Sequence, residues 1–188
     1  MPNLHEGLDE LHAAMEALVV FHERNGFKAH IVMIGELRDH ETISISISAA
    51  ETGHLVFGSL HTGSAARTVN RILDVYPAQQ RSQISLMISE SIRGILSQQL
   101  IPRVDKQGMA LALEVLLVNS GVSALIRDAR THQFTSVMQS GKRQGMQTMD
   151  DALLELVKSG TISGDDAWFA AENKQVFDSM RSQQKQPG

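Results

Sequence analysis

The sequence of 188 residues contains no cysteine. Disulfide bonds and thiolate metal sites are therefore excluded, and this absence fits a protein of the cytosol. No stretch approaches the roughly 18 consecutive apolar residues of a membrane span, and the first residues carry no basic segment followed by an apolar core. We therefore expect a soluble protein that is not exported.

The chain also lacks an excess of positive charge. It has 17 Lys and Arg residues against 21 Asp and Glu residues, a formal net charge of -4 at pH 7. This balance gives no electrostatic reason to expect binding to nucleic acid or to an anionic membrane. With 42% hydrophobic residues the chain can bury one sizeable core, and we predict one domain with a helical C-terminal extension.

Two apolar runs are each followed by residues that can carry chemistry. The run Ile31–Ile34 is followed by Gly35 and Glu36, and the run over residues 54–60 is followed by His61. Short apolar runs bounded by glycine are typical of strands buried on both faces. In open α/β sheets the reactive groups gather where such strands end. We therefore expect Glu36 and His61 to lie side by side at one edge of a sheet.

Apolar residues in the first segment recur at steps of three and four, from Leu4 to Phe21, and Asn25-Gly26 supplies a stop. This spacing predicts an amphipathic helix over residues 4–24. The apolar face of such a helix usually packs on the protein core, so we expect this helix to pack on the sheet. The alternative is a helix that binds a partner.

Residues 42–48 alternate with period two, which is typical of a half-buried strand. The flanking residues favour a helix instead. Asp39 is a candidate N-cap, Glu41 suits a first helical turn, and Gly53 is a candidate C′ glycine. We predict a helix here.

The rest of the chain reads as helix, strand and helix again. Ser64 is expected to cap a helix through Leu73, a second helix is expected over residues 78–100, and residues 109–118 are expected to form one or two strands. Everything that follows has helical patterns, with Thr148 and Ser163 as candidate N-caps. Residues 181–188 are polar and are expected to form a frayed tail.

Several short sequence motifs resemble those of one known family. They are Gly35-Glu36-Leu37-Arg38-Asp39, Leu60-His61-Thr62-Gly63-Ser64-Ala65, Leu125-Ile126-Arg127-Asp128 and Gly145-Met146-Gln147-Thr148-Met149-Asp150. In their order and their residues, these motifs resemble the C-terminal ATPase domain of the type IV pilus retraction motors, the PilT branch of the secretion-ATPase superfamily. In that family the first motif is the end of the Walker B strand, and the second motif is the histidine box. The resemblance runs from about residue 31 to residue 162.

The resemblance implies an α/β fold, a partial RecA-like P-loop ATPase core in which a mostly buried sheet is flanked by helices, with an all-helical C-terminal extension. Residues 1–118 would be the core with the N-terminal helix, the Walker B strand and the histidine box. Residues 119–180 would be the helical region, and residues 181–188 the tail.

The resemblance also assigns a site for ATP and Mg²⁺. Glu36 and His61 would be catalytic, because a carboxylate at a strand end can hold Mg²⁺ or polarise a water, and an imidazole can donate a hydrogen bond to the γ-phosphate. The alternatives are a carboxylate that caps the next helix, a structural histidine, and arginines that are merely solvated on a helix face. The residues that the resemblance places on the nucleotide are Gly35, Arg38, Thr62, Arg67 and Arg71.

One part of such a site is not among the 188 residues. A phosphate-binding loop needs Gly-x-x-x-x-Gly-Lys-Ser/Thr, and the only Gly-Lys pair, Gly141-Lys142, is followed by Arg143 and preceded by Ser136 at the required glycine position. The Gly141-Lys142 pair is a decoy. We therefore expect this polypeptide alone to bind ATP weakly and to be inactive by itself.

Three hypotheses follow from these residues. The first is a pilus retraction ATPase component, which couples ATP hydrolysis to pilus disassembly in a ring that is hexameric in the family. It would be cytoplasmic and reach the inner membrane through pilus platform proteins, as a homo-oligomer or a hetero-oligomer with a full-length motor. The second is a non-catalytic truncated paralogue that joins or regulates a full-length ring. The third is a gene remnant or a misassigned start codon.

Overall fold

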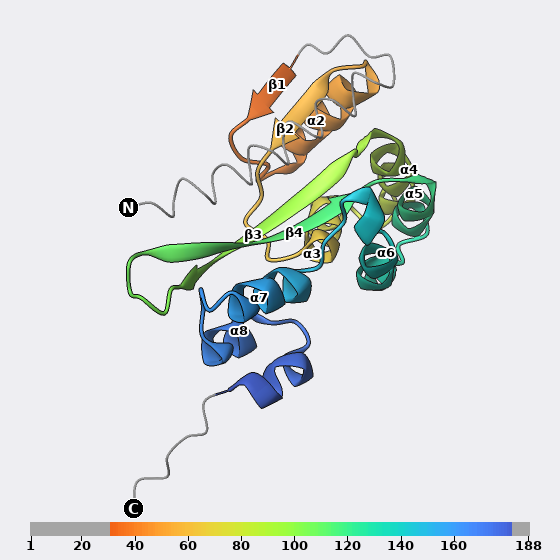
Figure 1. Cartoon of the computed structure of the whole chain (residues 1–188). Helices are drawn as coiled ribbons and strands as arrows, with labels where there is room; N and C mark the ends of the chain where they lie inside the picture. The colour runs from red at the N-terminus through yellow and green to blue at the C-terminus, as the bar shows by residue number, and fades with distance from the viewer. Residues whose placement is uncertain (1–30, 182–188) are drawn as a thin grey trace, which may run out of the picture.

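The structure, a computed structural model, describes residues 31–181, so the predicted helix over residues 4–24 and all but the first residue of the predicted tail lie outside the described residues. Figure 1 shows a small β–α–β unit at one end, a long β-hairpin across the middle, and helices along the hairpin. The elements are β1 (Ile31–Ile34), α2 (His40–Glu51), β2 (Leu55–Gly58), α3 (Ala65–Asp74), α4 (Arg81–Ser91), β3 (Gly94–Pro102), β4 (Met109–Leu117), α5 (Ser120–Arg127), α6 (Phe134–Ser140), α7 (Met149–Lys158) and α8 (Gly164–Ala170), with 3₁₀ turns at Thr131–Gln133, Lys142–Gln144 and Lys174–Met180.

The first two strands form where the sequence predicts them, and they pair in parallel with Ile31 opposite Leu55 and Ile34 opposite Gly58. The prediction that both are buried on both faces is wrong for β1. Ile31 is 56% exposed and Met33 is 76% exposed, because among residues 31–181 β1 has only β2 as a neighbouring strand. Parallel pairing still brings both carboxyl ends to one edge.

The predicted helix over the alternating segment is confirmed as α2. Asp39 accepts a hydrogen bond from the Thr42 N–H at 2.9 Å, and the Thr42 hydroxyl completes a capping box. Gly53, one residue past the C-cap, takes φ +93, a backbone conformation that favours glycine. The caps at both ends thus outweigh the period-two alternation.

The prediction of one helix over residues 78–100 is wrong in its second half. The helix α4 ends at Ser91, and Ile92 has extended backbone. Residues 94–102 instead form β3, which pairs antiparallel with β4 along its whole length, from Gly94 opposite Leu117 to Pro102 opposite Met109. Pairing with the next strand overrides the helical pattern here, because apolar residues suit both structures and only the partner strand decides between them.

The later predictions are confirmed. Residues 109–117 form the single strand β4, and all the regular structure from residue 119 to residue 181 is helical. The Thr148 hydroxyl accepts from the Asp151 N–H at 3.1 Å, and the Ser163 hydroxyl accepts from the Asp166 N–H at 3.0 Å, so both are N-caps. Among residues 31–181 no helix is long and apolar enough to cross a membrane.

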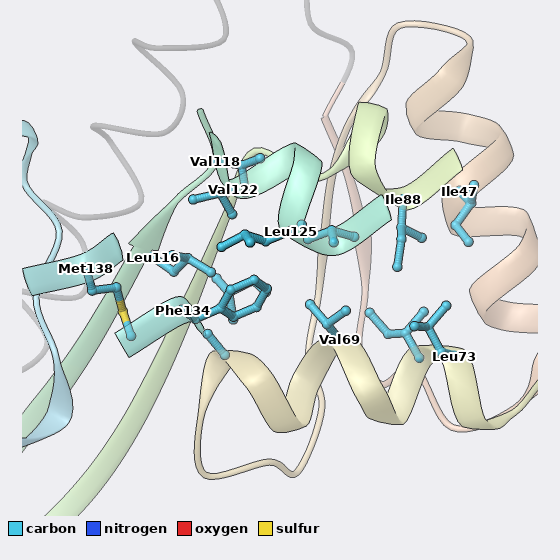
Figure 2. Close-up of a cluster of buried hydrophobic side chains, with 14 of the residues drawn as sticks. Ile47, Val69, Leu73, Ile88, Leu116, Val118, Val122, Leu125, Phe134 and Met138 are labelled. Atoms are coloured by element: carbon cyan, nitrogen blue, oxygen red, sulfur yellow. The ribbon is translucent and has the colours of Figure 1, made fainter. Parts of the chain in front are cut away.

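The hairpin β3–β4 joins two groups of buried side chains. The first core cluster gathers side chains from α2, α3, α4, the inner end of the hairpin, α5 and α6, and Figure 2 shows them pointing toward one another. The second core cluster lies along the outer part of the hairpin, and its members are Ile101, Ala110, Ala112, Met149, Ala152, Leu153, Ile162, Ala167, Ala171 and Phe177. The predicted domain division after residue 118 stays a prediction.

Candidate functional site

The ends of β1 and β2 are tied to each other beyond their last paired residues. The Leu37 N–H donates to the Ser59 carbonyl at 2.9 Å, and the Ser59 hydroxyl donates to the Gly35 carbonyl. These two bonds hold the two strand ends together. Glu36 lies between Gly35 and Leu37, and His61 follows Ser59 by two residues. The two side chains are therefore placed side by side, as the sequence predicts.

Glu36 is the centre of this edge. Its Oε1 lies 2.7 Å from Arg38 Nε and 3.4 Å from His61 Nε2. The hydrogen bond from Arg38 holds the pKa of Glu36 below its ordinary value, and the same bond raises the pKa of Arg38. The carboxyl is therefore ionised at neutral pH, next to two groups that can bind an anion.

A hollow of about 200 Å³ opens at this edge. It is lined by Leu37 and Leu60 and by four residues that the sequence assigned to the site, namely Glu36, Arg38, His61 and Arg71. A carboxylate with two arginines and an imidazole can contact both a cation and the phosphate groups that the cation neutralises. The arrangement is thus chemically suited to a metal-bound phosphate.

The other predicted residues lie around this hollow but not in it. Gly35 and Thr62 line a larger neighbouring cavity of about 930 Å³ between β2 and β3. The Thr62 hydroxyl pairs with the Thr68 hydroxyl at 2.6 Å. Arg67 is exposed and lines neither cavity, which leaves the alternative of a solvated arginine in place for this residue. The structure therefore gathers Glu36, Arg38, His61 and Arg71 around the hollow, and Arg67 does not line it.

The residues fit Mg²⁺ only as a partly protein-bound ion. Among the described residues no group of three or more His, Cys, Asp or Glu side chains could hold a metal. Mg²⁺ is commonly bound by one or two carboxylates, with water and substrate phosphates as its other ligands, and Glu36 is one such carboxylate. The pair Gly141-Lys142 lies elsewhere, where Lys142 Nζ contacts Asp151 Oδ1 at 2.7 Å.

The sequence analysis missed one charged residue, Glu114 on β4. Its side chain is 1% exposed, and its Oε1 accepts the Ala65 N–H at 2.7 Å. Burial raises the pKa of Glu114 above its ordinary value of 4.5, the Ala65 N–H lowers it, and the nearby Glu172 carboxylate raises it again. The signal was available, because a single carboxylate stands inside the apolar run over residues 109–118.

Replacing Glu114 by Gln is expected to change how stability depends on pH. Because the folded pKa lies above 4.5, the folded protein holds this proton more tightly, so stability present below pH 4.5 is lost as pH rises through the folded pKa. Glutamine does not titrate. The free energy of unfolding of Glu114→Gln, relative to the unmodified chain, should therefore increase as pH rises above 4.5.

Urea unfolding of both proteins at several pH values between about 4 and 7 measures this difference. Glu155→Gln is the matched control, because Glu155 is exposed on α7 and its replacement should change the free energy of unfolding by less than about 0.5 kcal/mol. A Glu114→Gln difference that falls with pH would contradict the burial argument.

Comparison with known proteins bears on this site. Residues 28–185 match the family model described as type II/IV secretion system protein. The chain is 45% identical over 145 residues to the twitching motility protein of Neisseria gonorrhoeae, covering 77% of this chain and 39% of that protein. It is 44% identical over 147 residues to the type IV pilus retraction ATPase PilT of Pseudomonas aeruginosa, covering 78% of this chain and 42% of that protein. The chain thus spans well under half the length of these relatives.

Solved structures agree with the sequence matches. A crystal structure of the pilus retraction motor PilT with bound ADP superposes with a TM-score of 0.71 at 37% identity, covering 88% of this chain and 45% of that chain. The Legionella pneumophila ATPase DotB superposes with a TM-score of 0.64 at 31% identity, covering 76% of this chain and 38% of that chain. These matches confirm the predicted resemblance and the predicted α/β fold class.

Proposed function

This chain belongs to the type II/IV secretion system protein family, and we propose that it is a component of a type IV pilus retraction ATPase. The family match covers residues 28–185, and the relatives named above are a twitching motility protein and a pilus retraction ATPase. Because the chain spans 39% and 42% of those proteins, coupling of ATP hydrolysis to pilus disassembly is a proposal for this chain.

One observation supports the proposal most. Glu36 and His61 follow two adjacent parallel strands, lie 3.4 Å apart, and face a hollow that Arg38 and Arg71 also line. Surface histidines and carboxylates meet by chance in many proteins, but the strand-end position of both is the place where α/β proteins bind their ligands. The hollow is therefore the best-supported place for the nucleotide phosphates.

The proposed roles follow from the chemistry of each group. Bound Mg²⁺ would neutralise phosphate charge, with Glu36 as its protein carboxylate or as the group that orients a water. His61 would donate a hydrogen bond to the terminal phosphate, and Arg38 and Arg71 would pair with phosphate oxygens or with an acidic edge of a neighbouring subunit. Gly35 and Thr62 would line the approach to the hollow, and Arg67 would act only at a subunit contact.

The proposal includes an assembly. The 188-residue polypeptide contains no Gly-x-x-x-x-Gly-Lys-Ser/Thr motif, so alone it should hold nucleotide weakly. We place it in a ring with copies of itself or of a full-length retraction ATPase, in the cytoplasm and at the inner membrane through pilus platform proteins. A non-catalytic member that joins or regulates such a ring is the alternative.

Binding of a fluorescent ATP analogue with Mg²⁺ tests this proposal. The purified chain is measured alone, and then mixed with the twitching motility protein of Neisseria gonorrhoeae, whose ATPase rate is also followed. We expect weak binding alone and a changed ATPase rate in the mixture. Glu36→Gln and His61→Ala in this chain should reduce that change about tenfold, because the substituted side chains no longer act on the reacting phosphates.

Glu155→Gln and His132→Ala are the matched controls, because both residues are exposed and lie far along the chain from the hollow. They should leave the rate change intact. Equal rates with Glu36→Gln, His61→Ala and the unmodified chain would refute the proposed site. A rate change that survives both substitutions would favour the non-catalytic regulator. An unchanged ATPase rate in the mixture would refute both the regulator and the mixed ring.

A further inference from the structure

The feature that the proposed function does not use is the buried carboxylate of Glu114. It lies on β4 directly opposite Ser97 of β3, between the Ile95–Leu116 pair of the first core cluster and the Ile101–Ala110 pair of the second. Removing a carboxyl group from water is unfavourable unless hydrogen bonds and dipoles compensate. A buried carboxyl group at the junction of two clusters therefore needs specific groups as hydrogen-bond partners.

The N-terminus of one helix provides part of that compensation, whereas Glu114 Oε2 has no hydrogen-bond partner among the described residues. Glu114 Oε1 accepts the Ala65 N–H at 2.7 Å, and Ala65 is the first residue of α3. The backbone of Met149, the first residue of α7, also lowers the pKa of this carboxyl. Helix N-termini carry partial positive charge, so a carboxylate between two of them attracts both. Glu114 thus binds the start of α3 through Oε1, and the start of α7 is close enough to influence the same carboxyl.

The start of α3 is connected directly to the loop that carries His61. The loop that carries His61 runs from Ser59 to Ser64 and enters α3 at Ala65. One end of this loop is held by the Leu37–Ser59 hydrogen bond, and the other end is held where Glu114 binds Ala65. The side chain of Glu114 therefore fixes the end of the His61 loop that the strand pairing does not reach.

The second helix start is tied to the same part of β4. Val115 and Gln147 exchange backbone hydrogen bonds of 2.8 Å and 2.9 Å, and the Gln147 side chain donates to the Leu113 carbonyl at 2.9 Å. Within α7, the Asp150 carboxylate accepts the N–H groups of Glu172 and Asn173 at 2.9 Å and 3.0 Å. The segment after α8 is thereby linked to the first turn of α7, next to Glu114.

We infer that Glu114 is a positioning residue, which fixes the loop that carries His61 and joins this loop to the first turn of α7. The C-terminal helices can then influence His61 through one side chain, although they contribute no residue to the hollow around Glu36. The inference rests on the proposed nucleotide site for its functional meaning, but the positioning itself is a property of the chain without nucleotide.

Amide hydrogen exchange of the full chain, without nucleotide, tests this inference. Glu114→Asp keeps the charge and shortens the side chain by one methylene group, so it loses the reach to Ala65. Glu114→Gln keeps the length and the acceptor oxygen. We expect Glu114→Asp to speed exchange about tenfold in residues 62–68 and in residues 149–152 together, and Glu114→Gln to stay within about threefold of the unmodified chain.

Val122→Ala is the control for general loss of stability, because Val122 is fully buried in the first core cluster and neither its side chain nor its backbone touches Glu114 through a hydrogen bond. Under native conditions, Val122→Ala should leave the amide exchange rates of residues 62–68 and 149–152 within about threefold of those in the unmodified chain. Equal acceleration by Val122→Ala, or acceleration of only one segment by Glu114→Asp, would overturn the inference. Failure of nucleotide binding in the separate fluorescence experiment would leave this result unaffected.

Discussion

Replacing Phe134 by Ala is expected to lower the free energy of unfolding by about 3 to 5 kcal/mol, which corresponds to a fall in Tm of about 10 °C. Phe134 begins α6, its side chain is 1% exposed, and it lies in the first core cluster among side chains from α3 and β4 (Figure 2). The loss combines the transfer of the ring to water with the cavity that the surrounding side chains cannot fill. Thermal unfolding followed by circular dichroism measures it.

Phe169→Ala is the matched control, since Phe169 on α8 is 69% exposed. This substitution should change the free energy of unfolding by less than about 0.5 kcal/mol. Comparable losses for the two variants would contradict the assignment of Phe134 to the core.

The same variant tests whether the two core clusters unfold together. The only tryptophan of the sequence, Trp168, packs against the second core cluster, whereas Phe134 belongs to the first. Because β3 and β4 contribute side chains to both clusters, we expect Trp168 fluorescence and circular dichroism to report one midpoint, shifted equally by Phe134→Ala. Two separate midpoints would instead support a division of the chain into independent units.

Local signals in the sequence were sufficient where both ends of an element carry them. The helix α2 is bounded by the Asp39 capping box and by Gly53, so its prediction held against an alternating pattern. The sequence after α4 carries no local signal that indicates which strand it pairs with. Residues 94–102 became a strand because residues 109–117 lie opposite them, and this pairing is not encoded in any short window of sequence.

The candidate site shows the same contrast. The proximity of Glu36 and His61 was predictable, because parallel strands bring their carboxyl ends to one edge. The separation of Arg67 from Arg71 was not, since both lie on one face of α3 and only the tertiary structure decides which one reaches the hollow. Glu114 was visible as a charge within an apolar strand, but its contact with Ala65, 49 positions earlier in the sequence, was not.

Replacing Gly164 by Ala is expected to destabilise the C-terminal helices, by about 2 to 3 kcal/mol. Gly164 begins α8, and a methyl group on it would lie 1.9 Å from the carbonyl oxygen of Met180 and 2.5 Å from its carbonyl carbon. These are backbone atoms, which cannot rotate away as a side chain can. The turn Lys174–Met180 must therefore move off α8 or the helix must shift.

Trp168 makes this displacement measurable. Lys174 Nζ and Arg181 Cζ each lie 4.2 Å from the centroid of its ring, and its Nε1 donates to Asp178 Oδ1 at 2.8 Å. All three partners are on the segment that Gly164→Ala would push away, so the fluorescence of the folded protein should change together with its stability. Gly35→Ala is the control, because a methyl group there meets nothing within 4 Å. An unchanged Trp168 signal and an unchanged midpoint for Gly164→Ala would mean that the terminal turn does not rest on α8.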